Sequence, residues 1–190
     1  MILLGPQGSG KGTQAKRIEA EYGIPHIATG DMLRAAIEQG SELGKRVKPI
    51  VESGQLVPDD LMIELIRERL SEPDGQDGFI LDGFPRTAAQ ANALDEMLEE
   101  IGRRPSVVFE FQVFDDVAKE RLFKRAALEG RTDDAPDVIE RRLRLYHEQT
   151  EPLVEHYRLQ GNLVGIHAGR SVNEVFSEIQ QALEQAAARS

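Results

Sequence analysis

The stretch Gly-Pro-Gln-Gly-Ser-Gly-Lys-Gly-Thr, residues Gly5 to Thr13, contains four glycines, one lysine and one threonine in nine positions. Gly5 and Gly10-Lys11 match the pattern G-x-x-x-x-G-K-[ST] of loops that bind nucleotide phosphates. The next position departs from that pattern, because Gly12 stands where a Ser or Thr is expected and Thr13 comes one residue later. The stretch therefore raises two questions: whether it binds phosphate, and which kind of phosphate loop it is.

The flanking residues favour phosphate binding. The apolar run 1–4 predicts a buried strand before the loop, and residues 11–22 predict a helix after it. Glycines allow backbone N–H groups to turn toward a phosphate, and the helix N-terminus adds positive potential, to which Lys11 adds a full charge. The structural alternative is a plain turn, but a turn needs only one or two glycines and no lysine.

A dinucleotide fingerprint is a second functional alternative. Residues Gly10 to Ala15 match G-x-G-x-x-A, and Asp31 follows at about the expected distance. The first glycine of that fingerprint lies at the end of a strand, whereas here the predicted strand ends before Gly5. No convincing strand comes directly before Asp31 either, so we reject this interpretation.

Predicted strands and helices alternate along the chain, which favours an α/β fold with a doubly wound parallel sheet. Apolar runs predict strands at 1–4, 27–28, 78–83, 106–113 and 163–167. Helices are predicted at 11–22, 31–39, 42–52, 58–70, 87–101, 115–127, from 137 with an interruption before Pro152, and at 172–188. Ligands of such sheets bind outside the carboxyl ends of the strands.

The composition limits the class of protein. A chain of 190 residues with 40% hydrophobic residues is long enough for one domain with a substantial core. The absence of cysteine excludes disulfides and thiolate zinc sites. A net charge of −10 argues against nucleic-acid binding. No targeting segment and no apolar run of membrane-spanning length is present, which predicts a soluble cytoplasmic protein without a membrane partner.

Three further stretches narrow the function. They are Ala28 to Arg34 (ATGDMLR), Leu81 to Thr87 (LDGFPRT) followed by Gln90, and 130–134 (GRTDD) followed by Arg142. Together with the opening loop, in which glycine follows the lysine, they resemble the adenylate kinases, a family of phosphate-loop NTPases. The resemblance runs from Ile2 to about Pro152, and four motifs in the same order make it specific.

The resemblance implies reversible phosphoryl transfer from ATP to AMP, giving two ADP, with Mg²⁺ bound together with ATP. Such an enzyme serves nucleotide biosynthesis and adenine nucleotide homeostasis. The resemblance also implies three parts: a core (1–27, 58–123 and 135–190), an AMP-binding insertion (28–57) and a short lid (124–134). The short lid and the lack of cysteine favour the type without zinc, and the family suggests a monomer.

The resemblance also assigns site residues. The catalytic set is Lys11, Arg86, Arg121, Arg131 and Arg142. The ATP side comprises Gly8, Ser9, Gly10, Lys11, Gly12, Thr13, Arg125 and Gly169. The AMP side comprises Thr29, Arg34, Gln55, Leu56, Val57, Gly83, Phe84, Pro85, Arg86, Gln90, Arg131 and Arg142. Asp82, the acid that ends an apolar run, is assigned to Mg²⁺ through water.

Two other functions are weighed against an adenylate kinase. The similar UMP/CMP kinases usually carry Asn after the DGFPR arginine, whereas Thr87 here favours AMP as the acceptor. A nucleotide-bound switch without catalysis is the other alternative. The chain lacks the guanine-recognising sequence N-K-x-D, and a second set of arginines for an acceptor is superfluous in a switch.

Overall fold

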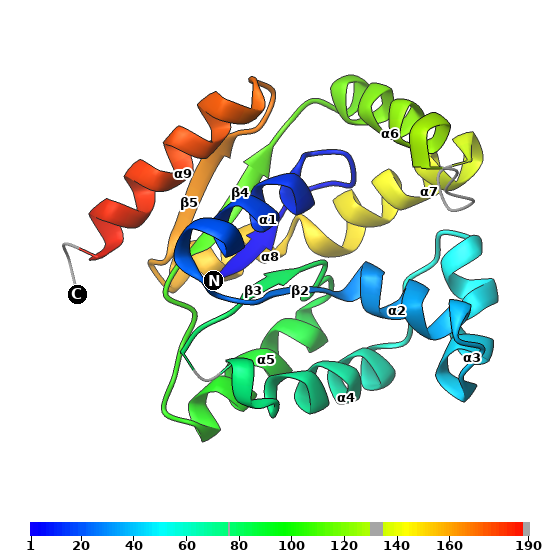
Figure 1. Ribbon diagram of the computed structural model, residues 1–190, viewed down its shortest axis with the longest axis horizontal. Coiled ribbons are helices and arrows are strands. Elements are labelled where there is room, and N and C mark those ends of the chain that lie inside the picture. Colours follow the sequence, from blue (N-terminus) through cyan, green and yellow to red (C-terminus); the bar gives the residue numbers. More distant parts are fainter. Residues whose placement is uncertain (76, 130–134, 188–190) are drawn as a thin grey trace.

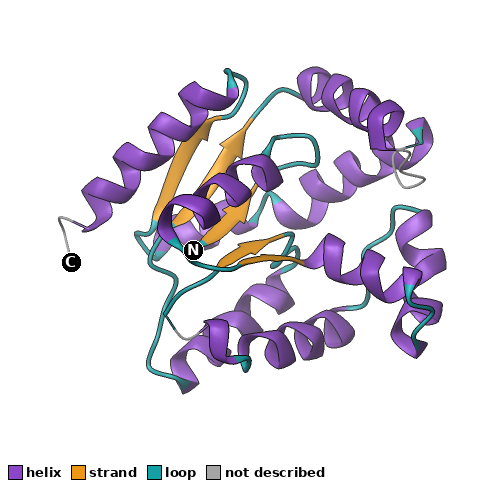
Figure 2. Ribbon diagram, in the orientation of Figure 1, coloured by secondary structure: helices purple, strands orange, loops and turns teal. Residues whose placement is uncertain are grey.

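The computed structural model describes residues 1–75, 77–129 and 135–187. Its sheet is parallel, with strand order β2-β3-β1-β4-β5, and helices cover both faces (Figures 1 and 2). The strands are β1 (Ile2–Leu4), β2 (His26–Ala28), β3 (Ile80–Asp82), β4 (Val108–Gln112) and β5 (Leu163–His167). The predicted α/β fold with a doubly wound parallel sheet is therefore confirmed.

Alternate residues of each strand face opposite sides of the sheet, and each side has its own core. Leu3 and Phe109 pack on one face with Ile18, under α1 (Lys11–Tyr22) and α9 (Val172–Ala187). Their neighbours Ile2 and Val108 pack on the other face, which is covered by α4 (Asp59–Leu70), α5 (Ala88–Glu100) and α8 (Leu153–Leu159). This double burial explains why the central strand β1 is a continuous apolar run without alternation.

The remaining helices lie toward one end of the sheet. The pair α2 (Thr29–Glu38) and α3 (Glu42–Glu52) follows β2, while α6 (Asp115–Glu129) and α7 (Pro136–Leu145) follow β4 (Figure 1). A short 3-10 turn, η1, covers Pro73–Gly75.

Several predicted boundaries were wrong by a few residues. The helix expected from Asp31 begins at Thr29, and the strand expected at 106–113 covers Val108–Gln112. The interruption expected before Pro152 is a π-helical turn, η3 (Tyr146–Thr150), which joins α7 to α8. There the Glu151 N–H donates to the Tyr146 carbonyl at 2.9 Å, five residues back.

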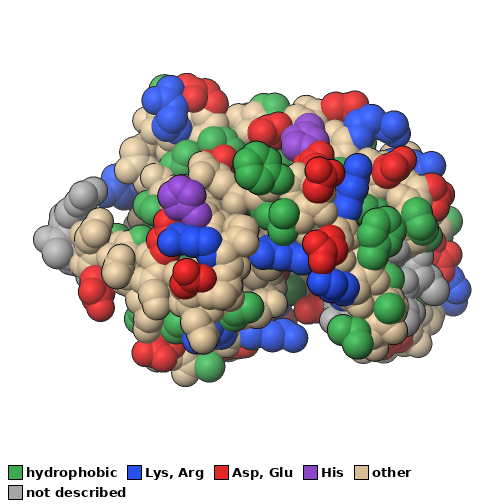
Figure 3. All heavy atoms as spheres, turned by 90° about the horizontal axis from the view of Figure 1, so that it is seen from above, with side chains coloured by type: hydrophobic (Ala, Val, Ile, Leu, Met, Phe, Trp, Pro, Cys, Tyr) green, Lys and Arg blue, Asp and Glu red, His purple; other side chains and the backbone are tan. Residues whose placement is uncertain are grey.

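Parallel pairing brings the carboxyl ends of the strands to one edge of the sheet. Leu3 and Ala28 are both paired with Asp82, the last residue of β3. Gly5, just after β1, and Thr29, just after β2, therefore lie at the same edge. Among the described residues, no helix combines the length and apolar character needed to cross a bilayer. On the face seen in Figure 3, acidic and basic side chains are interspersed.

Gly44 allows α2 and α3 to approach each other closely. A Cβ at position 44 would lie 1.9 Å from the carbonyl oxygen of Ala36, an atom of the α2 backbone that cannot rotate away. We therefore expect Gly44→Ala to lower the free energy of unfolding by about 2 kcal/mol or more, because the two helices must separate. Urea unfolding at unchanged m-value measures this effect.

Lys45→Ala is the matched control, because Lys45 is an exposed neighbour on α3. It should change the free energy of unfolding by less than about 0.5 kcal/mol. If both variants unfolded at the same urea concentration, the close approach at Gly44 would not limit stability.

Candidate active site

The loop between β1 and α1 wraps around the ammonium group of Lys11. Lys11 Nζ donates to the carbonyl oxygens of Gly5 and Pro6 at 2.7 and 2.8 Å, and lies 3.3 Å from Ser9 Oγ. Gly8 has φ +82°, and a Cβ there would lie 2.4 Å from the carbonyl oxygen of Ala118 on α6. Position 8 therefore requires glycine for both its conformation and its space.

Lys11 lies where positive charges converge. Its pKa is lowered to about 8, chiefly by burial and in smaller part by Arg86, Arg142 and Arg125, while Asp82 acts in the opposite direction. Lys11 and these three arginines all line one space. An anion that enters this space would be attracted by all four cations.

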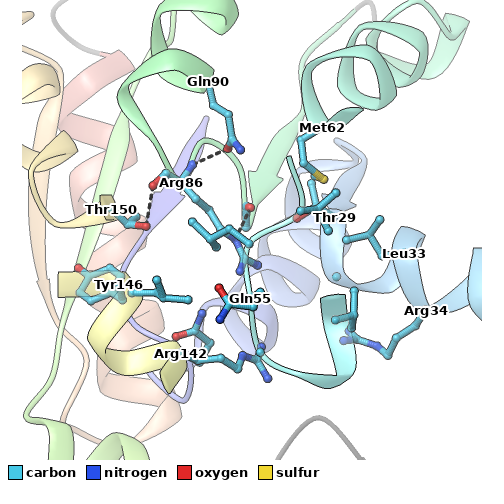
Figure 4. A pocket seen from close by; sticks show the side chains of 18 residues that line it. Thr29, Leu33, Arg34, Gln55, Met62, Arg86, Gln90, Arg142, Tyr146 and Thr150 are labelled. Atoms are coloured by element: carbon cyan, nitrogen blue, oxygen red, sulfur yellow. Dashed lines mark hydrogen bonds between the residues drawn. The ribbon is translucent and has the colours of Figure 1, made fainter. Parts of the chain in front are cut away.

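That space is a cleft of about 550 Å³ outside the carboxyl ends of the strands. Every residue of the loop from Gly8 to Thr13 lines it, and so do Asp82, Arg121 and Arg125. Beside it lies a smaller pocket of about 60 Å³, lined by residues of α2, α5 and η3 and by the segment that follows α3 (Figure 4). Arg34, Arg86 and Arg142 line both spaces.

Arg86 is the arginine whose surroundings are most clearly defined. Its Nε donates to the Gly83 carbonyl at 2.7 Å, which fixes the start of the side chain. Burial lowers its pKa to about 10, with Arg142 as the next cause and Arg34 as a smaller one, while Asp82 opposes them. Mutual repulsion of the three guanidinium groups costs free energy, which a bound phosphate would relieve.

Thr150 holds the backbone of Arg86. The Thr150 hydroxyl is buried and donates to the Arg86 carbonyl at 2.9 Å, so the π-helical turn η3 supports the arginine (Figure 4). Tyr146, at the other end of the same turn, also lines the smaller pocket. Neither residue was predicted from the sequence to belong to the site.

Arg121 connects the phosphate loop to the loop after β5. Its Nη1 donates to the carbonyl oxygens of Ala168 at 2.9 Å and Ser9 at 3.4 Å. Gly169 lies between Ala168 and Arg170, which both line the cleft. Arg125 follows Arg121 by one helical turn on α6 and lines the same cleft.

Asp82 ends β3 beside the phosphate loop. Burial alone would raise its pKa, but the hydrogen bond from His26 and the charges of Lys11 and Arg86 hold its pKa below the usual value. His26 Nε2 lies 3.3 Å from Asp82 Oδ2. A Cβ at position 12 would lie 3.6 Å from that same oxygen, so the hydroxyl missing from Gly12 would have faced Asp82.

The smaller pocket contains most of the residues expected on the AMP side. It is lined by Thr29, Arg34, Gln55, Leu56, Val57, Gly83, Arg86, Gln90 and Arg142. Phe84 is instead buried in the core, and Pro85 lines the larger cleft. Apolar side chains of Leu33, Val51 and Met62 complete the walls, which suits the face of a flat ring.

Gln90 is fixed by hydrogen bonds on both ends of its carboxamide. The oxygen Oε1 accepts from the Arg86 N–H at 2.8 Å, and the nitrogen Nε2 donates to Asp59 Oδ1 at 2.8 Å. Gln90 is only 2% exposed, so its orientation is set by these partners and not by solvent.

A model of the adenylate kinase family matches residues 3–162. The chain belongs to the adenylate kinase family. It is 48% identical over 188 residues to an adenylate kinase of Caulobacter vibrioides, covering 99% of this chain and 98% of the relative. An adenylate kinase of Parvibaculum lavamentivorans is 46% identical over 186 residues, which cover 96% of this chain and 91% of the relative. An adenylate kinase of Archaeoglobus fulgidus is 41% identical over 211 aligned positions, which cover 97% of each chain.

Membership of the adenylate kinase family favours neither the UMP/CMP kinase nor the switch. The family uses ATP with Mg²⁺. Within residues 1–75, 77–129 and 135–187, no three His, Cys, Asp or Glu side chains lie close enough to hold a metal ion. An ion next to Asp82 would therefore take most of its ligands from phosphate and water.

One assigned residue, Arg131, lies outside the described residues, as do the other residues of 130–134. Three residues that support the site were not predicted from the sequence, namely Asp59, His26 and Thr150. The only signal for Thr150 was the expected interruption near Pro152. His26 and Asp59 gave none, because their partners are far away in the sequence.

Proposed function

We propose that this chain transfers the terminal phosphoryl group of ATP to AMP and back, with the larger cleft as the ATP side and the smaller pocket as the AMP side. The observation that supports this is the position of Arg34, Arg86 and Arg142, which line both spaces. Two nucleotides bound there would bring their phosphates together at these arginines.

The phosphate loop holds the donor. Backbone N–H groups from Gly8 to Thr13 and the positive end of α1 contact the β- and γ-phosphates of ATP. Lys11 shifts from its carbonyl partners to the phosphate oxygens, a better partner for a buried ammonium group. On α6, Arg121 and Arg125 act from the side of the adenine and the transferring group, and Gly169 contributes backbone.

The arginines promote the reaction by position and charge. Phosphoryl transfer needs little covalent assistance from the protein, since negative charge only redistributes over the transferring oxygens. Arg86 and Arg142 hold the acceptor phosphate in line and neutralise that charge in a site that excludes water. The family motif predicts that Arg131 also neutralises this charge.

The acceptor base is held in the smaller pocket. Thr29 and Gln90 offer polar groups to the base, and the backbone of Gln55–Val57 lies along one side of it. The segment Gly83–Arg86 brings the chain close to the α-phosphate. The apolar walls contact the ring faces, while the polar groups distinguish one base from another. This division of roles supports AMP as the acceptor.

Asp82 is proposed to hold Mg²⁺ through a water molecule. Its carboxylate is ionised at neutral pH because His26, Lys11 and Arg86 hold its pKa low. The bound ion would neutralise charge on the phosphates of ATP. Glycine at position 12 leaves space for water between the loop and Asp82, which accounts for the departure from the common phosphate-loop pattern.

The division into parts remains our proposal as well. Residues 28–57 form the AMP-binding insertion and 124–134 a short lid without zinc. Their closure over the two nucleotides would exclude water and so suppress hydrolysis of ATP. A monomeric state and a cytoplasmic location remain predictions.

Incubation with ATP, AMP and Mg²⁺, followed by phosphorus NMR, tests the function. We expect ADP from both nucleotides until equilibrium is reached, and no ADP when Mg²⁺ is chelated. Acceptors compared at equal concentration should rank AMP far above CMP and UMP. No ADP in the complete mixture would support a switch, and faster turnover of CMP or UMP would support a pyrimidine nucleotide kinase.

A further inference from the structure

Asp59 lies outside the smaller pocket but next to one of its residues. It is the first residue of α4, and Pro58 alone separates it from the segment Gln55–Val57 that lines the pocket. Its Oδ1 accepts two hydrogen bonds, from Gln90 Nε2 at 2.8 Å and from the Thr87 hydroxyl at 2.9 Å. Thr87 is also the N-cap of α5, whose first turn carries Gln90.

We propose that Asp59 is a specificity-determining residue: it fixes the orientation of the Gln90 carboxamide and thereby selects adenine over 6-oxopurines. This inference rests on the proposed function, in which Gln90 contacts the acceptor base. Asp59 is a positioning residue, because it acts through Gln90 and does not itself line the pocket.

The two partners of the carboxamide allow only one orientation. An ionised carboxylate can only accept a hydrogen bond, and a backbone N–H can only donate one. The nitrogen Nε2 must therefore face Asp59 and the oxygen Oε1 must face the Arg86 N–H. A carboxamide turned by 180° would place oxygen against the carboxylate and nitrogen against the N–H, and both hydrogen bonds would be lost.

The fixed carboxamide still has one donor and one acceptor for a ligand. Nε2 carries a second N–H, and Oε1 has a second lone pair. A glutamine in this state pairs with the amino group and the neighbouring ring nitrogen of adenine. Hypoxanthine and guanine carry a carbonyl oxygen where adenine carries the amino group, so they would place an acceptor against Oε1.

The test is the ratio of kcat/KM for AMP to that for IMP in the Asp59→Asn variant. Asparagine keeps the shape of Asp59 but can also donate, so a turned Gln90 keeps a partner on that side. We expect the AMP/IMP ratio to fall about tenfold, through a gain for IMP as well as a loss for AMP. The Arg86 N–H still disfavours the turned carboxamide, which limits the fall.

Asp60→Asn is the matched control, because the neighbouring Asp60 makes the same change of charge at an exposed position. It should leave the ratio unchanged. A loss of stability alone in Asp59→Asn would lower both rates together and also leave the ratio unchanged. Thermal unfolding of each variant confirms that the compared proteins are folded.

The double variant Asp59→Asn with Gln90→Met shows whether Asp59 acts through Gln90. If it does, the AMP/IMP ratio of the double variant equals that of Gln90→Met alone. The proposal is overturned if Asp59→Asn leaves the ratio unchanged, or if its effect persists in full on the Gln90→Met background. Turnover of AMP by the unaltered protein tests the function separately.

Discussion

Replacing Arg86 by alanine is expected to lower kcat by about 10³-fold or more, while ATP still binds to the phosphate loop. Arg86 lines both the cleft and the smaller pocket, and an arginine that neutralises the transferring phosphoryl group contributes about 10³- to 10⁵-fold to kcat in similar reactions. Steady-state rates with both substrates varied, together with ATP binding by calorimetry, measure the two effects separately.

Arg104→Ala is the control for this variant, since Arg104 is exposed and lines neither space. It should leave kcat within about twofold, as expected for a surface substitution. The two variants remove the same charge, so nonspecific loss of positive charge cannot explain a difference between them. An Arg86→Ala enzyme with near-normal turnover would remove Arg86 from the proposed mechanism.

Replacing Lys11 by methionine is expected to reduce kcat/KM for ATP by about 10²- to 10³-fold, the usual effect of removing a group that stabilises developing charge. Methionine keeps the apolar length of the side chain but leaves the carbonyl oxygens of Gly5 and Pro6 without their ammonium donor. The loop should therefore loosen as well, and the unfolding temperature of the variant has to be measured beside its rate.

The pH dependence gives a second test of Lys11 in the unaltered enzyme. Because burial lowers its pKa to about 8, Lys11 is charged below that pH and becomes neutral above it. Since kcat/KM reports the ionisation of the free enzyme, kcat/KM for ATP should be level below about pH 8 and fall above it. A profile that stays level to pH 10 would show that Lys11 keeps its proton and that the cleft is better hydrated than the structure indicates.

The sequence was sufficient where a function depends on residues that are close together in the chain. The phosphate loop, the acid Asp82 at the end of a strand and the arginine of DGFPR each belong to a short motif between two elements. Parallel pairing then brings these motifs to one edge, as the fold class predicted. Arg34, Arg86 and Arg142 were assigned by the resemblance to the adenylate kinases, and in the structure all three line both the cleft and the smaller pocket.

The supporting residues could not be assigned in this way. Thr150 is 64 residues from Arg86, His26 is 56 from Asp82, and Asp59 is 31 from Gln90. Each is a single polar residue whose partner is brought near only by the packing of separate elements. Neither the hydrophobic periodicity nor a sequence motif distinguishes such a residue.

The π-helical turn Tyr146–Thr150 changes the direction in which side chains point between α7 and α8. Each helix can therefore bury its own apolar residues, although the two sets do not lie on one continuous helical face. Before the turn, Ile139 and Leu143 are buried, while Arg142 lines the cleft and the smaller pocket. After the turn, Leu153 and Tyr157 are buried in the core beside the sheet. Successive residues of an α-helix are about 100° apart around the axis. A chain one residue shorter here would rotate α8 by that angle, and it could keep either the arginine in its site or the tyrosine in its core, but not both.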